Sequence, residues 1–124
     1  MVGKQALLDV LNDLEELRQQ LAALTRDQPD GWKNSYFALR RTGAPLLTNL
    51  QNLANTWLAE QGDTLEAKQF RELTAAMRRA LADHQASFPV SSIAPDDPLF
   101  RASSQRVDAA RANVHSFVKA RMKA

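Results

Sequence analysis

The first helix-forming segment, residues 7–24 (LLDVLNDLEELRQQLAAL), has an apolar residue at every third or fourth position. This spacing brings the apolar side chains to one side of an α-helix. Burial of each stabilises a fold by roughly 1.5–3 kcal/mol, so a helix standing alone would forfeit most of a domain's net stability. The segment therefore requires partner helices. The six residues that recur with a seven-residue period are Leu7, Val10, Leu14, Leu17, Leu21 and Leu24.

Two further leucines, Leu8 and Leu11, widen the apolar side of this segment. An apolar surface this broad is typical of a bundle interior rather than of a two-stranded coiled coil. A chain of 124 residues can bury one core, so we expect a single domain over residues 1–124. The whole chain has only four glycines and five prolines, which favours helices as the partners.

Turn-forming residues divide the chain into four amphipathic segments. We expect helices over residues 4–25, 32–61, 64–88 and from 98 nearly to the end of the chain. Gly43 and Pro45 interrupt the second segment, so that helix should be bent or broken there. Short connections between helices of similar length place neighbours antiparallel. The sequence therefore predicts an all-α fold, an up-down-up-down four-helix bundle.

Capping residues mark the starts of the last two helices. Asp63 and Glu66 have the spacing of a capping box for the third helix. Asp97 directly precedes Pro98, and proline at the first helical position loses no hydrogen bond. We therefore expect Asp97 to cap the fourth helix.

Both histidines fall on or beside apolar helix faces, His84 in the third helix and His115 in the fourth. A di-iron bundle would also need Glu-x-x-His pairs, which are missing. We therefore expect both histidines, like Trp32 and Trp57, to be packing residues. The sequence has no Gly-rich phosphate loop, no Ser-His-Asp order and no cysteine. It indicates no catalytic residue, no cofactor, no metal and no small-molecule substrate.

Basic side chains are the remaining candidates for a site. The formal net charge is only +2, but the last helix is basic and the first is acidic. A basic helix steers a protein toward phosphate or an acidic partner, and the two helices can equally pair with each other. The candidates for contact with a nucleic-acid backbone are Arg40, Arg41, Arg78, Arg79, Arg111, Lys119 and Arg121.

Residues 36–43 (YFALRRTG) place a tyrosine ahead of a basic pair and a glycine, and Thr48-Asn49, Trp57-Leu58 and Gly62 follow. Residues 100–103 (FRAS) open the last helix, and residues 117–121 (FVKAR) close it. Together these motifs resemble the small helical subunit of type III-B, or related, CRISPR effector complexes of antiviral defence. The resemblance implies a non-catalytic bundle that stacks with copies of itself in a ribonucleoprotein complex. It would bind the backbone of a single strand or a heteroduplex without reading bases.

The leading hypothesis is therefore a structural subunit that binds nucleic-acid backbone. The alternative is a protein-interaction bundle, an adaptor or regulator, that uses an exposed apolar groove and has no nucleic-acid role. A sensor or phosphotransfer bundle that uses His84 or His115 is a third possibility. The N-terminal residues 1–14 lack the uninterrupted apolar run of a signal peptide, and no segment is long enough to span a membrane. We therefore expect a cytoplasmic protein with no membrane partner.

Overall fold

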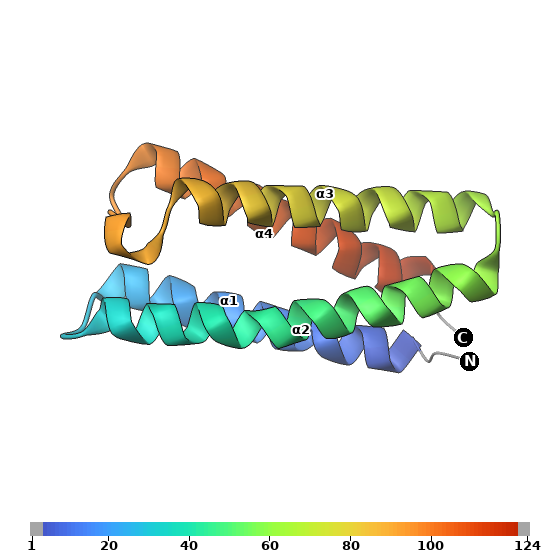
Figure 1. The fold of residues 1–124 in the computed structure, drawn as a ribbon, viewed down its shortest axis with the longest axis horizontal. Helices are drawn as coiled ribbons and strands as arrows, with labels where there is room; N and C mark the ends of the chain where they lie inside the picture. The colour runs from blue at the N-terminus through green and yellow to red at the C-terminus, as the bar shows by residue number, and fades with distance from the viewer. Residues whose placement is uncertain (1–3, 122–124) are drawn as a thin grey trace.

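The computed structural model describes residues 4–121 and contains four long helices (Figure 1). Neighbouring helices run antiparallel, and the described residues include no strand. The prediction of an all-α up-down-up-down four-helix bundle is confirmed. The elements are α1 (Lys4–Asp27), α2 (Trp32–Gln61), α3 (Leu65–Ser87), a short 3₁₀ helix η1 (Val90–Ser92) and α4 (Pro98–Arg121).

The start of α3 differs from the prediction. Thr64 is its N-cap, and the Thr64 side chain accepts a hydrogen bond from the backbone N–H of Ala67 at 3.1 Å. The capping box predicted for Asp63 and Glu66 is therefore wrong. α3 begins only at Leu65, which leaves Asp63 one residue too early to reach the free N–H groups of the first turn.

The start of α4 agrees with the prediction. The carboxylate of Asp97 accepts a hydrogen bond from the N–H of Leu99 at 2.9 Å, with Pro98 as the first helical residue. This contact satisfies one of the free donors of the first turn.

α2 continues through Gly43 and Pro45 as one helix of 30 residues. Pro45 has no N–H to offer the preceding turn, which loosens a helix at that point. Figure 1 shows the second half of α2 turning toward α3. The helix is thus bent rather than broken.

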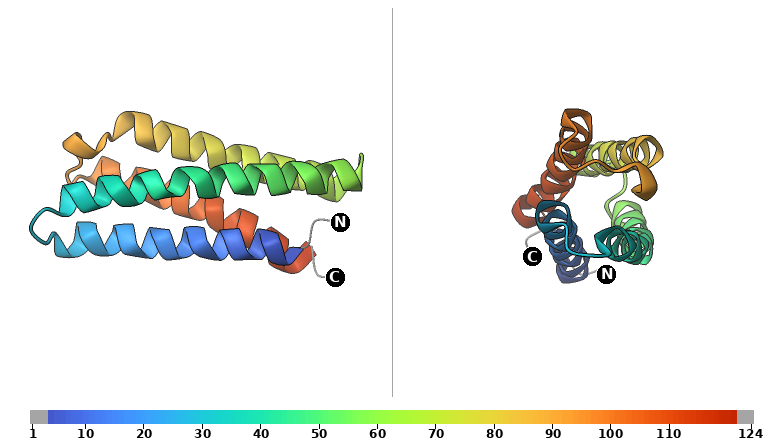
Figure 2. Two further views of the ribbon diagram at one scale, coloured as in Figure 1. Left: turned by 60° about the horizontal axis from the view of Figure 1, so that its bottom comes forward. Right: turned by 90° about the vertical axis from the view of Figure 1, so that its left-hand side faces the viewer.

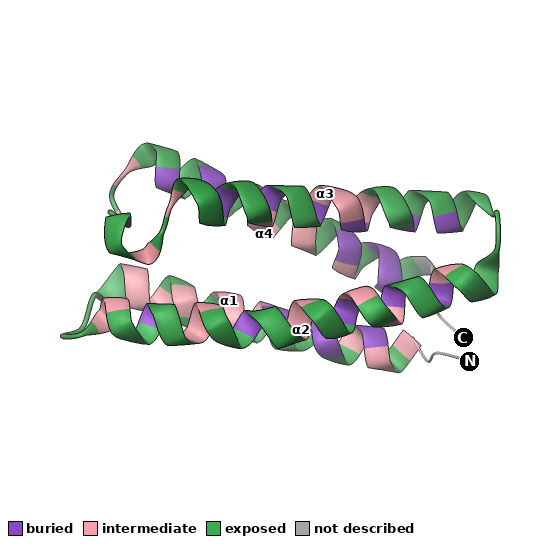
Figure 3. Ribbon diagram, in the orientation of Figure 1, coloured by how far each residue is buried: buried purple, intermediate pink, exposed green. Residues whose placement is uncertain are grey.

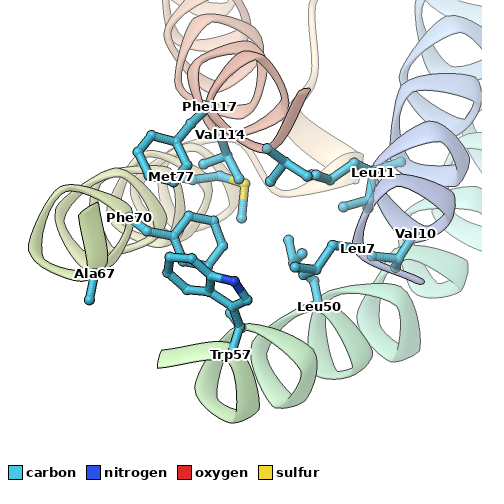
Figure 4. Packing of buried hydrophobic residues seen from close by; sticks show 13 residues of the cluster. Leu7, Val10, Leu11, Leu50, Trp57, Ala67, Phe70, Met77, Val114 and Phe117 are labelled. Atoms are coloured by element: carbon cyan, nitrogen blue, oxygen red, sulfur yellow. The ribbon is translucent and has the colours of Figure 1, made fainter. Parts of the chain in front are cut away.

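The bundle consists of two hairpins, α1–α2 and α3–α4. Viewed end-on, α4 lies beside α1 and α3 beside α2 (Figure 2). The main apolar cluster joins the hairpins toward the end where α1 begins and α4 ends. Within it Trp57 meets Phe70 edge-on, with ring centroids 5.3 Å apart, and Phe70 stacks on Phe117 at 5.4 Å (Figure 4). Its buried residues are Leu7, Val10, Leu11, Leu14, Leu50, Ala54, Trp57, Ala67, Phe70, Met77, Val114, Phe117 and Val118.

A second apolar cluster closes the opposite end. It consists of buried Tyr36, Ile93 and Phe100, with partly buried neighbours that include Phe88 and Val90. Ile93 follows η1, and η1 lies between the two hairpins at this end (Figure 1). The loop between α3 and α4 therefore fills space that helix side chains alone do not fill.

Burial changes along α1. Its buried residues lie in the first half, whereas Leu17, Leu21 and Leu24 are only half-buried (Figure 3). The heptad pattern continues unchanged, so the difference arises from the partner helices. The hairpins cover the second half of α1 less completely than the first, although Leu21 and Leu24 still pack against the second cluster.

Candidate ligand-binding cavity

A cavity of about 540 Å³ lies between the hairpins. Its walls come from residues 14–28, 36–47, 77–85 and 95–111, so all four helices contribute. Cavities of about 300–1,000 Å³ are typical of small-molecule sites. The space lies between the two apolar clusters, in the part of the bundle where neither cluster holds the two hairpins together.

Much of the cavity wall is apolar. A smaller hollow of about 300 Å³ between α2 and α3 shares Leu47, Met77, Leu81 and Gln85 with it, so the two spaces are neighbours. A guest that covers the apolar wall would stabilise the complex by about 25 cal/mol for every Å² of apolar surface that it removes from water. The apolar residues of the main cavity include Leu14, Leu17, Leu21, Leu47, Met77, Leu81, Phe100 and Val107.

A charged network connects α1 and α4 at this cavity. The Arg18 guanidinium donates to Glu15 at 2.7 Å and lies 3.9 Å from Asp108, and Arg111 forms an ion pair with Glu15. The hydrogen bond from Arg18 lowers the pKa of Glu15 to about 2, whereas burial raises the pKa of Asp108. The acidic first helix and the basic last helix therefore pair in part with each other.

Arg40 projects toward the interior from α2. Its Nη1 donates to the carbonyl oxygen of Phe88 at 2.9 Å, and its guanidinium carbon lies 5.3 Å from the centre of the Tyr36 ring. The contact with Phe88 ties α2 to the C-cap residue that follows α3. A cation over an aromatic face adds about 0.5–2 kcal/mol of attraction, depending on how dry the site is.

Two guanidinium groups at the cavity have buried nitrogens with no hydrogen-bond partner. These are Nη2 of Arg40 and Nε of Arg111, and both residues line the cavity. Leaving a buried donor unpaired costs about 1–3 kcal/mol, and more for a charged group. Each of these two guanidinium groups therefore keeps one buried donor that the described residues do not use.

His84 also borders the cavity and bonds across to α4. Its Nδ1 lies 2.7 Å from Oγ of Ser103, and its ring packs near Phe88 and Phe100. Burial, followed by the charges of Arg40 and Arg106, lowers the pKa of His84 to about 4. The ring is therefore neutral near pH 7. No carboxylate hydrogen-bonds to it within residues 4–121, so the His84–Ser103 pair lacks the acid of a catalytic triad.

His115 is half-buried on α4, and its Nε2 is buried without a hydrogen-bond partner. Burial lowers its pKa, and the nearby cations Lys119 and Arg111 act in the same direction. It does not line the cavity. Of the two histidines, His84 is the one that is buried and packs against aromatic rings, as predicted.

The structure divides six of the seven predicted basic residues into two groups. Arg40 and Arg111 line the cavity, with Arg111 in an ion pair. The side chain of Arg121 lies outside the described part. The other four residues are exposed on three helices, namely Arg41, Arg78, Arg79 and Lys119.

Sequence reasoning missed the cavity, two of its charged lining residues, Arg18 and Asp108, and Glu15, which pairs with Arg18. The sequence did contain a signal for two of these residues, namely their position beside the heptad line of the first helix. Arg18 directly follows Leu17 of the heptad line, and Glu15 directly follows Leu14. Residues next to the apolar line of a helix border the interface with neighbouring helices.

No protein-family model, curated protein or solved structure matches this chain. Among the described residues no helix is long and apolar enough to cross a membrane. The same residues include no group of three or more His, Cys, Asp or Glu side chains arranged to hold a metal ion.

Proposed function

We propose that this protein is a binding protein that takes an apolar small molecule into the cavity between its hairpins. The observation that carries the proposal is the cavity itself, a space of about 540 Å³ whose largely apolar surface includes leucines of α1, α2 and α3 beside polar and charged side chains. This combination is typical of small-molecule sites. The proposal departs from the expectation, based on sequence, that no small molecule is involved.

The closed ends of the cavity favour a small molecule over a partner helix. One end is bounded by the main apolar cluster and the other by Tyr36, Ile93 and Phe100, and the space is open to solvent along its side. A helix is about 10 Å across with its side chains, so seating one would require opening one of these clusters. A compact guest needs no such change.

A neutral apolar dye, Nile red, tests the proposal by its fluorescence on titration with the protein. We expect saturable binding, and we expect Leu81→Trp to reduce it at least tenfold because Leu81 borders both hollows. Leu65→Trp is the matched control, since Leu65 is 70 % exposed at the start of α3. Absence of dye binding, or equal binding by both variants, would overturn the proposal.

A second candidate function is binding of nucleic-acid backbone, as the CRISPR resemblance implies. It is favoured by one observation: Arg41, Arg78, Arg79 and Lys119 are exposed and form no ion pair within residues 4–121. Exposed cations without carboxylate partners are free to displace counterions from phosphates. In this function the protein would be one of several stacked copies in a ribonucleoprotein.

Fluorescence anisotropy with single-stranded RNA and DNA at two salt concentrations tests this second candidate. Binding should weaken with salt by a logarithmic slope of about 0.7 for each phosphate contact. Arg78→Glu/Arg79→Glu should abolish it, whereas Arg26→Glu/Lys33→Glu changes the net charge equally at the turn between α1 and α2 and should not. Binding that is insensitive to both salt and Arg78→Glu/Arg79→Glu would exclude the role.

A further inference from the structure

The arginines that line the cavity differ in their partners. Five arginines line it, and four of them pair with a carboxylate: Arg18 and Arg111 with Glu15, Arg26 with Asp27 and Arg101 with Asp96. Only Arg40 has no carboxylate partner among the described residues.

The partners of Arg40 leave its charge uncompensated. Its Nη1 binds a neutral carbonyl, that of Phe88, and its Nη2 is buried with no partner. The ion pairs between α1 and α4 nearby do not supply the missing negative charge. Arg18, Arg40 and Arg111 together carry three positive charges, against two negative charges on Glu15 and Asp108. One positive charge is therefore left over beside an apolar space.

The shape and lining of the cavity restrict the guest further. Along α1 the lining extends from Leu14 to Arg26, about 18 Å at 1.5 Å per residue. An elongated apolar body fits such a space, and one surplus cation matches one anionic group. A cationic guest would be repelled by Arg40, and a neutral one would leave the charge of Arg40 uncompensated.

We propose that the guest is an elongated apolar monocarboxylate, and that its carboxylate pairs with the uncompensated guanidinium charge of Arg40. This inference rests on the proposed binding function and specifies its ligand. A carboxylate presents two acceptor oxygens to a guanidinium, a geometry in which charge-assisted hydrogen bonds are strong. The apolar chain then lies along Leu17, Leu21 and Leu81.

Three ten-carbon compounds that differ only in the head group test the inference: decanoate, 1-decanol and decylamine. Each is titrated at pH 7.5 as a competitor of Nile red. We expect decanoate to displace the dye at a concentration at least tenfold lower than decanol, and decylamine to be the weakest. Equal displacement by decanoate and decanol overturns the inference but leaves the binding function standing. If neither the dye nor any decyl compound binds, the binding function itself fails.

Variants at Arg40 locate the head group. Arg40→Met should make decanoate no better than decanol, whereas Arg40→Lys keeps a cation and should retain part of the difference. Arg106→Met is the matched control, because Arg106 is exposed on α4 and does not line the cavity. A tenfold preference for decanoate that survives Arg40→Met assigns the carboxylate elsewhere and overturns the inference.

A measurement on the unaltered protein avoids any folding defect of the variants. The guanidinium N–H signals of Arg40 in a nitrogen-15 NMR spectrum should shift on addition of decanoate and stay in place on addition of decanol. Equal shifts with both compounds, or none with either under saturating conditions, would contradict binding at Arg40.

Discussion

Gly43 of α2 lies so close to Leu17 of α1 that a Cβ atom added to it would be 3.0 Å from Cδ2 of Leu17. The contact occurs where the cavity begins, since both residues line it. Leu17 is half-buried, and its terminal methyl group has free space beside it.

We therefore expect Gly43→Ala to stabilise the protein. Alanine in a helix interior is favoured over glycine by about 1 kcal/mol, and a small displacement of the Leu17 methyl group reduces this gain to about 0.5 kcal/mol. Urea unfolding measures the difference. Gly62→Ala is the matched control and should destabilise by about 1–2 kcal/mol, because Gly62 has a φ of 70°. A destabilising Gly43→Ala would show that the α1–α2 contact is rigid.

The N-cap of α3 gives a prediction that distinguishes Thr64, the cap in the structure, from Asp63, the cap predicted from the sequence. Thr64→Ala removes the acceptor for the N–H of Ala67 and should cost about 1 kcal/mol. Asp63→Ala should change stability by less than about 0.5 kcal/mol, as exposed positions away from caps usually do. Thermal unfolding of both variants measures this. A larger loss of stability for Asp63→Ala than for Thr64→Ala would support the predicted capping box instead.

His84 should make the protein sensitive to mild acid. Because its folded pKa of about 4 lies below the ordinary value of 6.5, the unfolded chain binds a proton first as the pH falls. Stability from this residue is therefore complete above pH 6.5 and decreases between 6.5 and about 4, by at most about 3 kcal/mol. Urea unfolding at pH 7.5 and 4.5 measures the loss. His84→Gln should remove most of it, and His115→Gln should leave it largely intact.

Glu15 should matter because two arginines depend on it. Glu15→Gln leaves Arg111, whose side chain is only 13 % exposed, without a carboxylate, and should cost about 1–3 kcal/mol. The pKa of Glu15 is lowered from 4.5 to about 2, so its contribution is complete above pH 4.5 and is lost between 4.5 and 2. The neighbouring Glu16→Gln, at an exposed position, should change stability by less than about 0.5 kcal/mol. Equal effects of the two variants would show that the network does not stabilise the fold.

The fold could be predicted from the sequence because local signals determine where each helix begins and ends. The heptad line from Leu7 to Leu24 predicts α1, and the bounds predicted for the second helix, residues 32–61, are those observed for α2. The error at Asp63 has a local cause as well. Asp63 and Thr64 are both acceptable caps by residue type, and the helix takes the one that directly precedes its first residue.

The cavity could not be predicted because apolar patterning defines which side of a helix faces inward and not how far away its partner lies. Leu14 and Leu21 occupy the same heptad line, yet Leu14 is buried and Leu21 is half-buried. The distance between the hairpins depends on Trp57, Phe70 and Phe117 at one end and on the inserted loop with Ile93 at the other. These contacts connect residues far apart in sequence, which a periodic pattern does not encode.

The division into two hairpins also has a consequence for how fast the chain reaches this structure. Each hairpin joins helices that are consecutive in the chain, so little ring-closure entropy is lost before apolar contacts form. Folds dominated by such local contacts reach the native state in about microseconds to milliseconds. We expect each hairpin to assemble early, and the union of the two halves around Trp57 and Phe70 to be the later, rate-determining event.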